Sequence, residues 1–136
     1  MMNEQAPTDR LDRVIVPIRV RYAECDPMQI AHHASYPVWM EIARTELLRA
    51  QGANYRDCEA SGVFFAVARM NIRYKRPARY DDELDLEVIG LPCEGVKVEH
   101  RYRLKRGKEL LMTADTTIVC ITGEGKAVPV PEGLLP

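Results

Sequence analysis

The stretch that decides the fold is residues 35–51, SYPVWMEIARTELLRAQ, because it holds the only long helical pattern in the sequence. Its apolar residues recur at three- and four-residue steps, the spacing of one helix face: Trp39, Ile42, Ala43, Leu47 and Ala50. The residues predicted to point in other directions are Glu41, Arg44, Thr45, Leu48 and Arg49. Ser35 is expected as the N-cap, and Gly52 as the stop signal. The sequence therefore predicts one long helix.

On either side of this helix the sequence has the patterns of strands. Residues 14–22 predict a strand in an edge or irregular position, because Pro17 cannot donate a ladder hydrogen bond. Residues 54–60 predict a short helical turn that ends at Gly62. Alternating apolar and polar residues then predict four antiparallel strands over 63–74, 84–88, 96–105 and 109–122, with a tight turn at 106–108. One helix against a one-sided antiparallel five-stranded sheet is an α+β architecture.

Length and composition fit one ordinary globular domain. The chain has 136 residues, 46% of them hydrophobic, and a net charge of −1, so it has no general attraction to nucleic acid or to an anionic membrane. No apolar run is long enough to span a bilayer, and the first residues are too polar for a signal peptide. We therefore expect a cytoplasmic protein with a disordered tail over 1–13, a domain over 14–130 and a second tail over 131–136.

The four cysteines are scattered, with no pair at Cys-x-x-Cys spacing: Cys25, Cys58, Cys93 and Cys120. Free thiols are expected in a reducing compartment, and neither a metal site nor a cofactor is expected. Cys25 adjoins Asp26 but has no recognisable His and Asn or Asp partners for nucleophilic catalysis, so it is interpreted as a small apolar filler.

The loop before the long helix carries the residues best suited to chemistry. Asp26 follows the first strand, and His32 and His33 come just before the helix. A loop carboxylate can attack a carbonyl or activate water, while the free N–H groups and positive dipole end of a helix stabilise an oxyanion. An Asp before a Pro is also ordinary turn chemistry, so the pattern alone leaves both interpretations open.

Three segments resemble the 4-hydroxybenzoyl-CoA thioesterase family, in particular the small bacterial acyl-CoA thioesterases: residues 26–36 (DPMQIAHHASY), 39–46 (WMEIARTE) and 72–84 (IRYKRPARYDDEL). The resemblance runs from about residue 14 to about residue 130. It implies the hotdog fold, a curved sheet wrapped around one central helix. It also implies hydrolysis of a CoA thioester, with Asp26 as nucleophile or general base and the backbone N–H near His33 polarising the carbonyl.

The residues expected to contact the substrate are Gln29, Tyr36, Glu41, Arg73, Lys75, Arg76 and Arg79. The four basic residues suit the phosphates of CoA, with a solvated strand face as the equal alternative. Glu41 is either a partly buried acid or a simply paired or exposed residue. Many family members have glycine at the position of Gln29. Gln29 is therefore expected either to change the loop shape or to donate its amide to the substrate.

Several functions remain open at this point. Besides an acyl-CoA thioesterase, the sequence allows an aryl-CoA thioesterase for hydroxybenzoyl- or naphthoyl-CoA, and a non-catalytic acyl-CoA-binding protein. A hydratase of the same fold would pair a catalytic His with an Asp or Glu in a pattern that this sequence lacks. The resemblance also implies a homodimer or homotetramer with the active site at an interface between chains.

Overall fold

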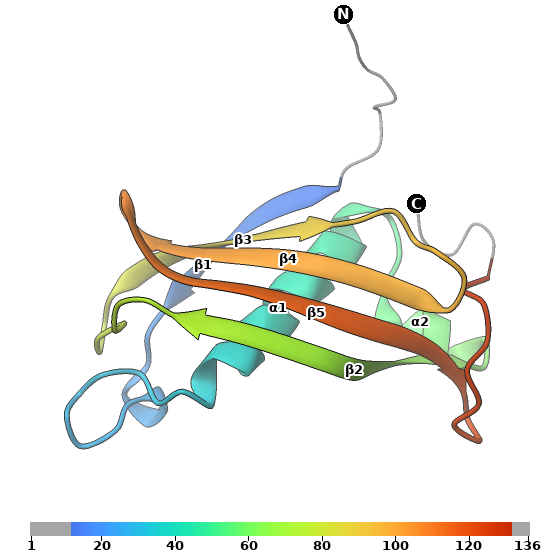
Figure 1. Cartoon of the computed structure of the whole chain (residues 1–136), viewed down its shortest axis with the longest axis horizontal. Coiled ribbons are helices and arrows are strands. Elements are labelled where there is room, and N and C mark those ends of the chain that lie inside the picture. Colours follow the sequence, from blue (N-terminus) through green and yellow to red (C-terminus); the bar gives the residue numbers. More distant parts are fainter. Residues whose placement is uncertain (1–11, 132–136) are drawn as a thin grey trace, which may run out of the picture.

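The protein is described by a computed structural model covering residues 12–131. Its elements follow one another as β1 (Arg13–Arg19), a 3₁₀ turn (Tyr22–Glu24), α1 (Ser35–Ala50), α2 (Tyr55–Ala60), β2 (Val63–Tyr74), β3 (Glu83–Gly90), β4 (Lys97–Arg106) and β5 (Glu109–Thr122) (Figure 1). The predicted order of strand, long helix and four further strands is confirmed. Arg13, expected in the N-terminal tail, already belongs to β1. Of the two predicted tails, residues 1–11 and 132–136 lie outside the described residues.

The five strands form one antiparallel sheet in the order β1-β3-β4-β5-β2. β3, β4 and β5 are neighbours in both sequence and space, and β1 and β2 flank them as the two edges. β1 pairs with β3 from Arg13 opposite Ile89 to Arg19 opposite Glu83. The edge position predicted for the strand with Pro17 is therefore confirmed.

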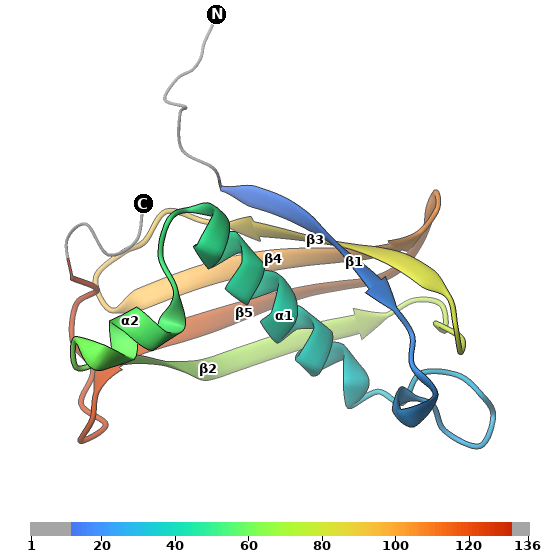
Figure 2. The same cartoon turned by 180° about the vertical axis from the view of Figure 1, so that it is seen from behind.

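Helix α1 lies across one face of the sheet, and α2 lies on the same side (Figure 2). The opposite face has no described helix in front of it (Figure 1). β4 shows the reason, since its residues alternate between exposed and buried over most of its length. The core lies between α1 and the sheet, around fully buried side chains that include Trp39, Met40, Leu86, Leu104 and Met112. No helix in this part of the chain is long and apolar enough to span a bilayer.

The buried face of α1 differs from the predicted one. Arg44 and Leu48 were expected to point elsewhere, but they are 7% and 4% exposed. Ile42, expected inside, is 41% exposed. The expected N-cap is also wrong, because Ser35 is the first helical residue and Ala34 occupies the cap position. The hydroxyl of Ser35 instead donates to the Glu24 carbonyl, so it ties the helix to the preceding loop.

Candidate active site

The loop between β1 and α1 is built around the carboxylate of Asp26. Its Oδ1 accepts hydrogen bonds from the N–H groups of Met28 at 2.9 Å and Ile30 at 3.4 Å. The Asp26 N–H donates to the Ile30 carbonyl at 2.9 Å and closes the turn. Within residues 12–131, Oδ2 accepts no hydrogen bond, and the residue is only half-buried. Asp26 therefore stabilises its own turn through Oδ1, while Oδ2 is available to bind a ligand or water.

Gln29 adopts a backbone conformation that glycine favours. Its φ is +64°, in the left-handed region, so a side chain at this position does not prevent that conformation. This conformation costs a residue with a side chain roughly 1–2 kcal/mol. Two hydrogen bonds help to offset that cost, from the Gln29 N–H to the Asp26 carbonyl and from the Tyr80 N–H to the Gln29 carbonyl. The exposed Gln29 side chain does not line the cavity described below.

Glu24 anchors the Asp26 loop to the start of α1. Its carboxylate is buried and accepts hydrogen bonds from the Trp39 indole at 2.8 Å and from the Arg21 N–H at 2.8 Å. Its carbonyl accepts from the His32 N–H and from the Ser35 hydroxyl. Burial acts to raise the pKa of Glu24, but the hydrogen bonds from Arg21 and Trp39 outweigh burial and hold the pKa below its usual value of 4.5. Sequence reasoning missed this residue.

The two histidines stack on each other at the entrance to α1. Their ring centres are 4.2 Å apart, and Nδ1 of His32 accepts a hydrogen bond from the Ala34 N–H at 3.1 Å. The carbonyl of His33 accepts from the Tyr74 hydroxyl at 2.9 Å. The N–H of His33, just before the cap residue Ala34, donates to no other described residue, so it is available to a ligand next to the start of the helix.

A cavity of about 370 Å³ brings the loop, the helix start and the end of β2 together. Its walls are formed by Asp26, Ile30, Ala31, His33, Tyr36, Tyr74, Lys75, Arg76 and Pro77. Five predicted site residues therefore meet in one place: Asp26, His33, Tyr36, Lys75 and Arg76. Tyr74 is an addition, and its ring meets that of Tyr36 edge-on at 4.9 Å. Tyr36 is both pocket wall and core, because it is 3% exposed and burial raises its pKa.

The predicted basic cluster is divided by the structure. Arg73 lies on the uncovered side of the sheet, beside Arg69 and Arg101, which fits the alternative of a solvated strand face. Arg79 is exposed and does not line the cavity, although its backbone pairs with that of Ile30. Lys75 and Arg76 remain at the cavity.

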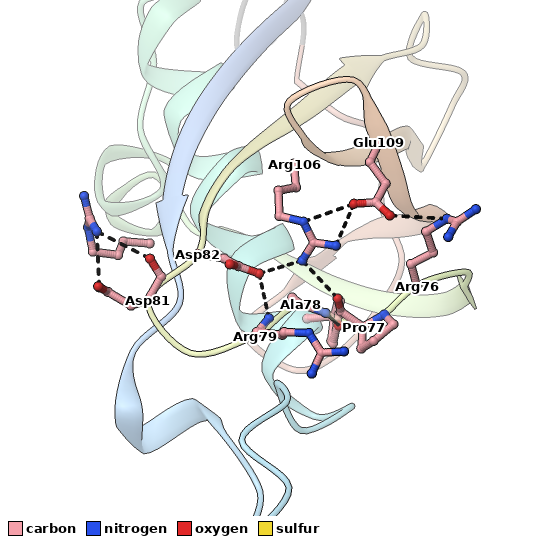
Figure 3. Close-up of polar contacts among 10 residues, drawn as sticks. Arg76, Pro77, Ala78, Arg79, Asp81, Asp82, Arg106 and Glu109 are labelled. Carbon is pink, nitrogen blue, oxygen red and sulfur yellow. Dashed lines mark hydrogen bonds and ion pairs between the residues drawn. The ribbon is translucent and has the colours of Figure 1, made fainter.

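Ion pairs hold the segment after β2 in place (Figure 3). Arg106 contacts Asp82 at 2.7 Å and Glu109 at 2.6 Å, and Arg76 contacts Glu109 at 3.5 Å. Arg106 also donates to the Pro77 carbonyl, while Asp82 accepts from the Arg79 N–H. The network fixes residues 77–82, and the Ala78 carbonyl in turn accepts from the Ala31 N–H at 2.7 Å. One wall of the cavity is thereby positioned from the β4–β5 hairpin.

Glu41 is exposed on α1 and lies away from the cavity wall. Its carbonyl accepts a hydrogen bond from the Thr45 hydroxyl within the same helix. The structure therefore fits the plainer of its two interpretations, an exposed helix carboxylate.

Comparison with known proteins decides the family. Residues 20–136 match the profile of the thioesterase-like superfamily. The chain belongs to this superfamily.

Individual members of the thioesterase-like superfamily agree with this match. YneP of Bacillus subtilis is 37% identical over 79% of this chain and 78% of its own length. The acyl-CoA thioester hydrolase YbgC of Escherichia coli is 32% identical over 77% of this chain and 79% of its own. A DHNA-CoA thioesterase structure from Staphylococcus aureus superimposes with a TM-score of 0.82 at 27% identity, over 86% of this chain and 80% of that one. The predicted family and hotdog fold are confirmed.

Proposed function

We propose that this protein is an acyl-CoA thioesterase that hydrolyses a CoA thioester to a free acid and CoA, with Asp26 as the catalytic carboxylate. The observation that carries the proposal is that Asp26 lines a cavity shared with His33 and the start of α1, and that its Oδ2 accepts no hydrogen bond from residues 12–131. The names of the relatives support the substrate class, since YbgC is an acyl-CoA thioester hydrolase.

The reaction divides between these groups in a simple way. As a general base, Asp26 takes a proton from water as the water oxygen bonds to the thioester carbon. As a nucleophile, it bonds to that carbon itself, and water then cleaves the acyl-aspartate anhydride. In both routes the C–S bond breaks and the thiolate takes up a proton. The negative charge on the carbonyl oxygen is stabilised by the His33 N–H and by the dipole of α1.

The cations beside the cavity suit the phosphates of CoA. Lys75 and Arg76 line the cavity, although Arg76 also contacts Glu109. Lys75 forms no ion pair within residues 12–131. We assign Lys75 to the nucleotide part of the substrate first, with Arg76 beside it at the cavity and Arg79 outside the cavity wall. Arg73, on the other face of the sheet, is a nucleotide contact only for a site completed by a second chain.

The test is thiol release from a panel of acyl-CoA substrates by wild type and Asp26→Asn. The variant keeps the shape of the side chain but removes its basicity, so kcat is expected to fall at least ~100-fold. Asp85→Asn, an exposed carboxamide change on β3, is the matched control and should keep full turnover. Near-normal turnover by Asp26→Asn would disprove the assignment. Mass spectrometry during turnover separates the two routes, because only the nucleophile forms an acyl adduct on the protein.

An aryl-CoA thioester is the second candidate substrate. The observation in its favour is the similarity to the Staphylococcus aureus protein, which is named a DHNA-CoA thioesterase. Aromatic acyl-CoA substrates therefore belong in the same panel. A kcat/KM at least ten times higher for an aromatic than for every aliphatic substrate would assign the protein to the aryl-CoA class.

A further inference from the structure

A second cavity lies at the other end of α1, and it contains a buried positive charge. Its volume is about 40 Å³, and it lies between the C-terminal half of α1, the Tyr55 end of α2 and strands β3, β4 and β5. Arg44 lines this cavity from the helix, and the residue is only 7% exposed. On α1 the lining of this cavity begins at Arg44, eight residues and about 12 Å along the helix from Tyr36, which lines the Asp26 cavity.

Arg44 has only neutral partners in the described part of the chain. It donates to the Tyr102 hydroxyl at 3.2 Å, and that hydroxyl lies 2.7 Å from the Thr116 hydroxyl. Burial raises the pKa of both Tyr102 and Tyr55, so these phenols carry no charge at neutral pH. Among residues 12–131, no carboxylate lies within 4.0 Å of the guanidinium.

His100 provides an independent indication of a missing ligand. It lines the same cavity, is 7% exposed, and its buried Nδ1 has no hydrogen-bond partner among residues 12–131. Nδ1 is the one buried side-chain nitrogen or oxygen within residues 12–131 that lacks a partner. Burial, together with the charge of Arg44, lowers the pKa of His100 to about 4, so the ring is neutral at pH 7. A neutral imidazole can donate one hydrogen bond from Nδ1.

An unpaired buried cation and an unpaired buried polar atom are each energetically unfavourable. We propose that this cavity binds a small monocarboxylate, held by the guanidinium of Arg44 and by Nδ1 of His100. The planar fork of an arginine matches a carboxylate, and charge-assisted bonds of this kind are the strong ones. The volume sets the size, because it holds roughly three water molecules, which corresponds to formate or acetate. Asp12, an exposed residue that also lines the cavity, disfavours dianions more strongly than monoanions.

The proposal is tested by titrating the full chain with sodium acetate at constant ionic strength and following the imidazole signals by NMR. With only three histidines in the sequence, His100 is readily assigned. Acetate should bind saturably and raise the pKa of His100, because the anion offsets the charge of Arg44. Acetamide, the neutral analogue, should not bind. Arg44→Met should raise the Kd for acetate at least about tenfold. The exposed Arg49→Met on the same helix should leave binding unchanged.

The titration overturns the proposal if acetate has no saturable effect on His100, if acetamide binds equally, or if Arg44→Met leaves acetate binding unchanged. If Arg44→Met does not fold, His100→Phe replaces it, with binding followed through the NMR signal of ¹³C-labelled acetate, and this variant must also weaken acetate binding. A triple variant, Glu4→Gln, Asp9→Asn and Asp12→Asn, removes the carboxylates of the N-terminal segment. Acetate binding by this variant alone would mean that the chain supplies its own carboxylate, and the proposal would be wrong. Because the readout is binding, the test does not depend on the function of Asp26.

Discussion

At the scale of single residues, the active-site loop depends on carboxylates with different tasks. Asp26 shapes its own turn with one oxygen, whereas Glu24 joins that turn to α1 through the Trp39 indole. An aspartate before a proline is visible in a sequence, and the family resemblance raises it to a catalytic candidate. Glu24 was missed because its importance comes from burial and from a partner fifteen residues away, which local sequence patterns do not reveal.

The first prediction concerns Glu24 as a positioning residue. In Glu24→Gln one carboxylate oxygen becomes an NH₂ group, so either the Arg21 N–H or the Trp39 indole loses its acceptor. The free energy of unfolding should therefore fall by about 1–3 kcal/mol. With the loop loosened, kcat should fall about tenfold while KM changes little, because the predicted CoA contacts lie elsewhere. Chemical denaturation and steady-state kinetics measure both effects. Glu46→Gln, on the exposed side of α1 beside Arg49, is the control. An unchanged kcat in Glu24→Gln would show that Glu24 is only structural.

The second prediction concerns the pH dependence of stability through His100. Its pKa is about 4 in the folded protein, against 6.5 for a free histidine ring, so the unfolded state binds a proton first as the pH falls. The contribution of His100 to the free energy of unfolding is therefore fully present above pH 6.5. It is lost as the pH falls from 6.5 to 4, by ~3 kcal/mol over the whole window. His100→Phe should show a flatter profile in this window and a constant offset from wild type above pH 7. Parallel profiles throughout would contradict the assignment. Urea denaturation at each pH provides the measurement.

At the scale of elements, the sequence predicted the helix and strand boundaries well but misassigned one helix face. β2 and β5 occupy the predicted ranges, 63–74 and 109–122, because period-two patterns and turn residues bound them clearly. On α1 the apolar pattern included Ile42 and excluded Arg44, whereas the structure exposes the first and buries the second. Periodicity assumes that a charged residue faces water. This assumption fails for Arg44, because its side chain is buried beside a cavity. The failure draws attention to that cavity as a second candidate site.

The third prediction concerns the hairpin between β4 and β5, which positions the cavity wall through Arg106. Arg106→Met removes the contacts to Asp82, Glu109 and the Pro77 carbonyl (Figure 3). Since these bonds are partly buried and form a network, the expected loss of unfolding free energy is about 1–2 kcal/mol. Arg49→Met, which removes a single exposed pair with Glu46, should change it by less than about 0.5 kcal/mol. Equal losses in thermal or urea unfolding would show that the network contributes nothing special.

At the scale of the whole molecule, the sequence predicted the architecture and the centre of the site, but not the distribution of the basic residues. Arg73 and Lys75 are two residues apart, yet one lies on the uncovered face of the sheet and the other at the Asp26 cavity. The strand ends at Tyr74, so the alternation of faces stops between them. A sequence pattern does not locate that change of direction, whereas the structure does.

The two edges of the sheet differ in a way that bears on assembly. β1 has seven residues and contains Pro17, which removes one donor from its free edge. β2 has twelve residues, contains no proline, and is intermediate or exposed along its whole length. A long unprotected edge strand is an association site unless another chain covers it. The free edge of β2 is therefore the surface on which we expect a second copy to pair.

The last prediction is that the protein is at least a dimer, as the family resemblance implies, and that the two chains join through β2. Light scattering at micromolar concentration should give at least twice the chain mass of 15.5 kDa. Val67→Lys places a charge on the β2 edge and should shift the mass towards the monomer, because edge lysines disfavour strand pairing. Ile15→Lys makes the same change at an exposed position of β1 and should leave the assembly intact. Circular dichroism must show both variants folded.

If the site is completed by the second chain, thioesterase activity should fall with the dimer fraction in Val67→Lys. A wild-type mass near 15.5 kDa with full activity would refute both the dimer and the shared site.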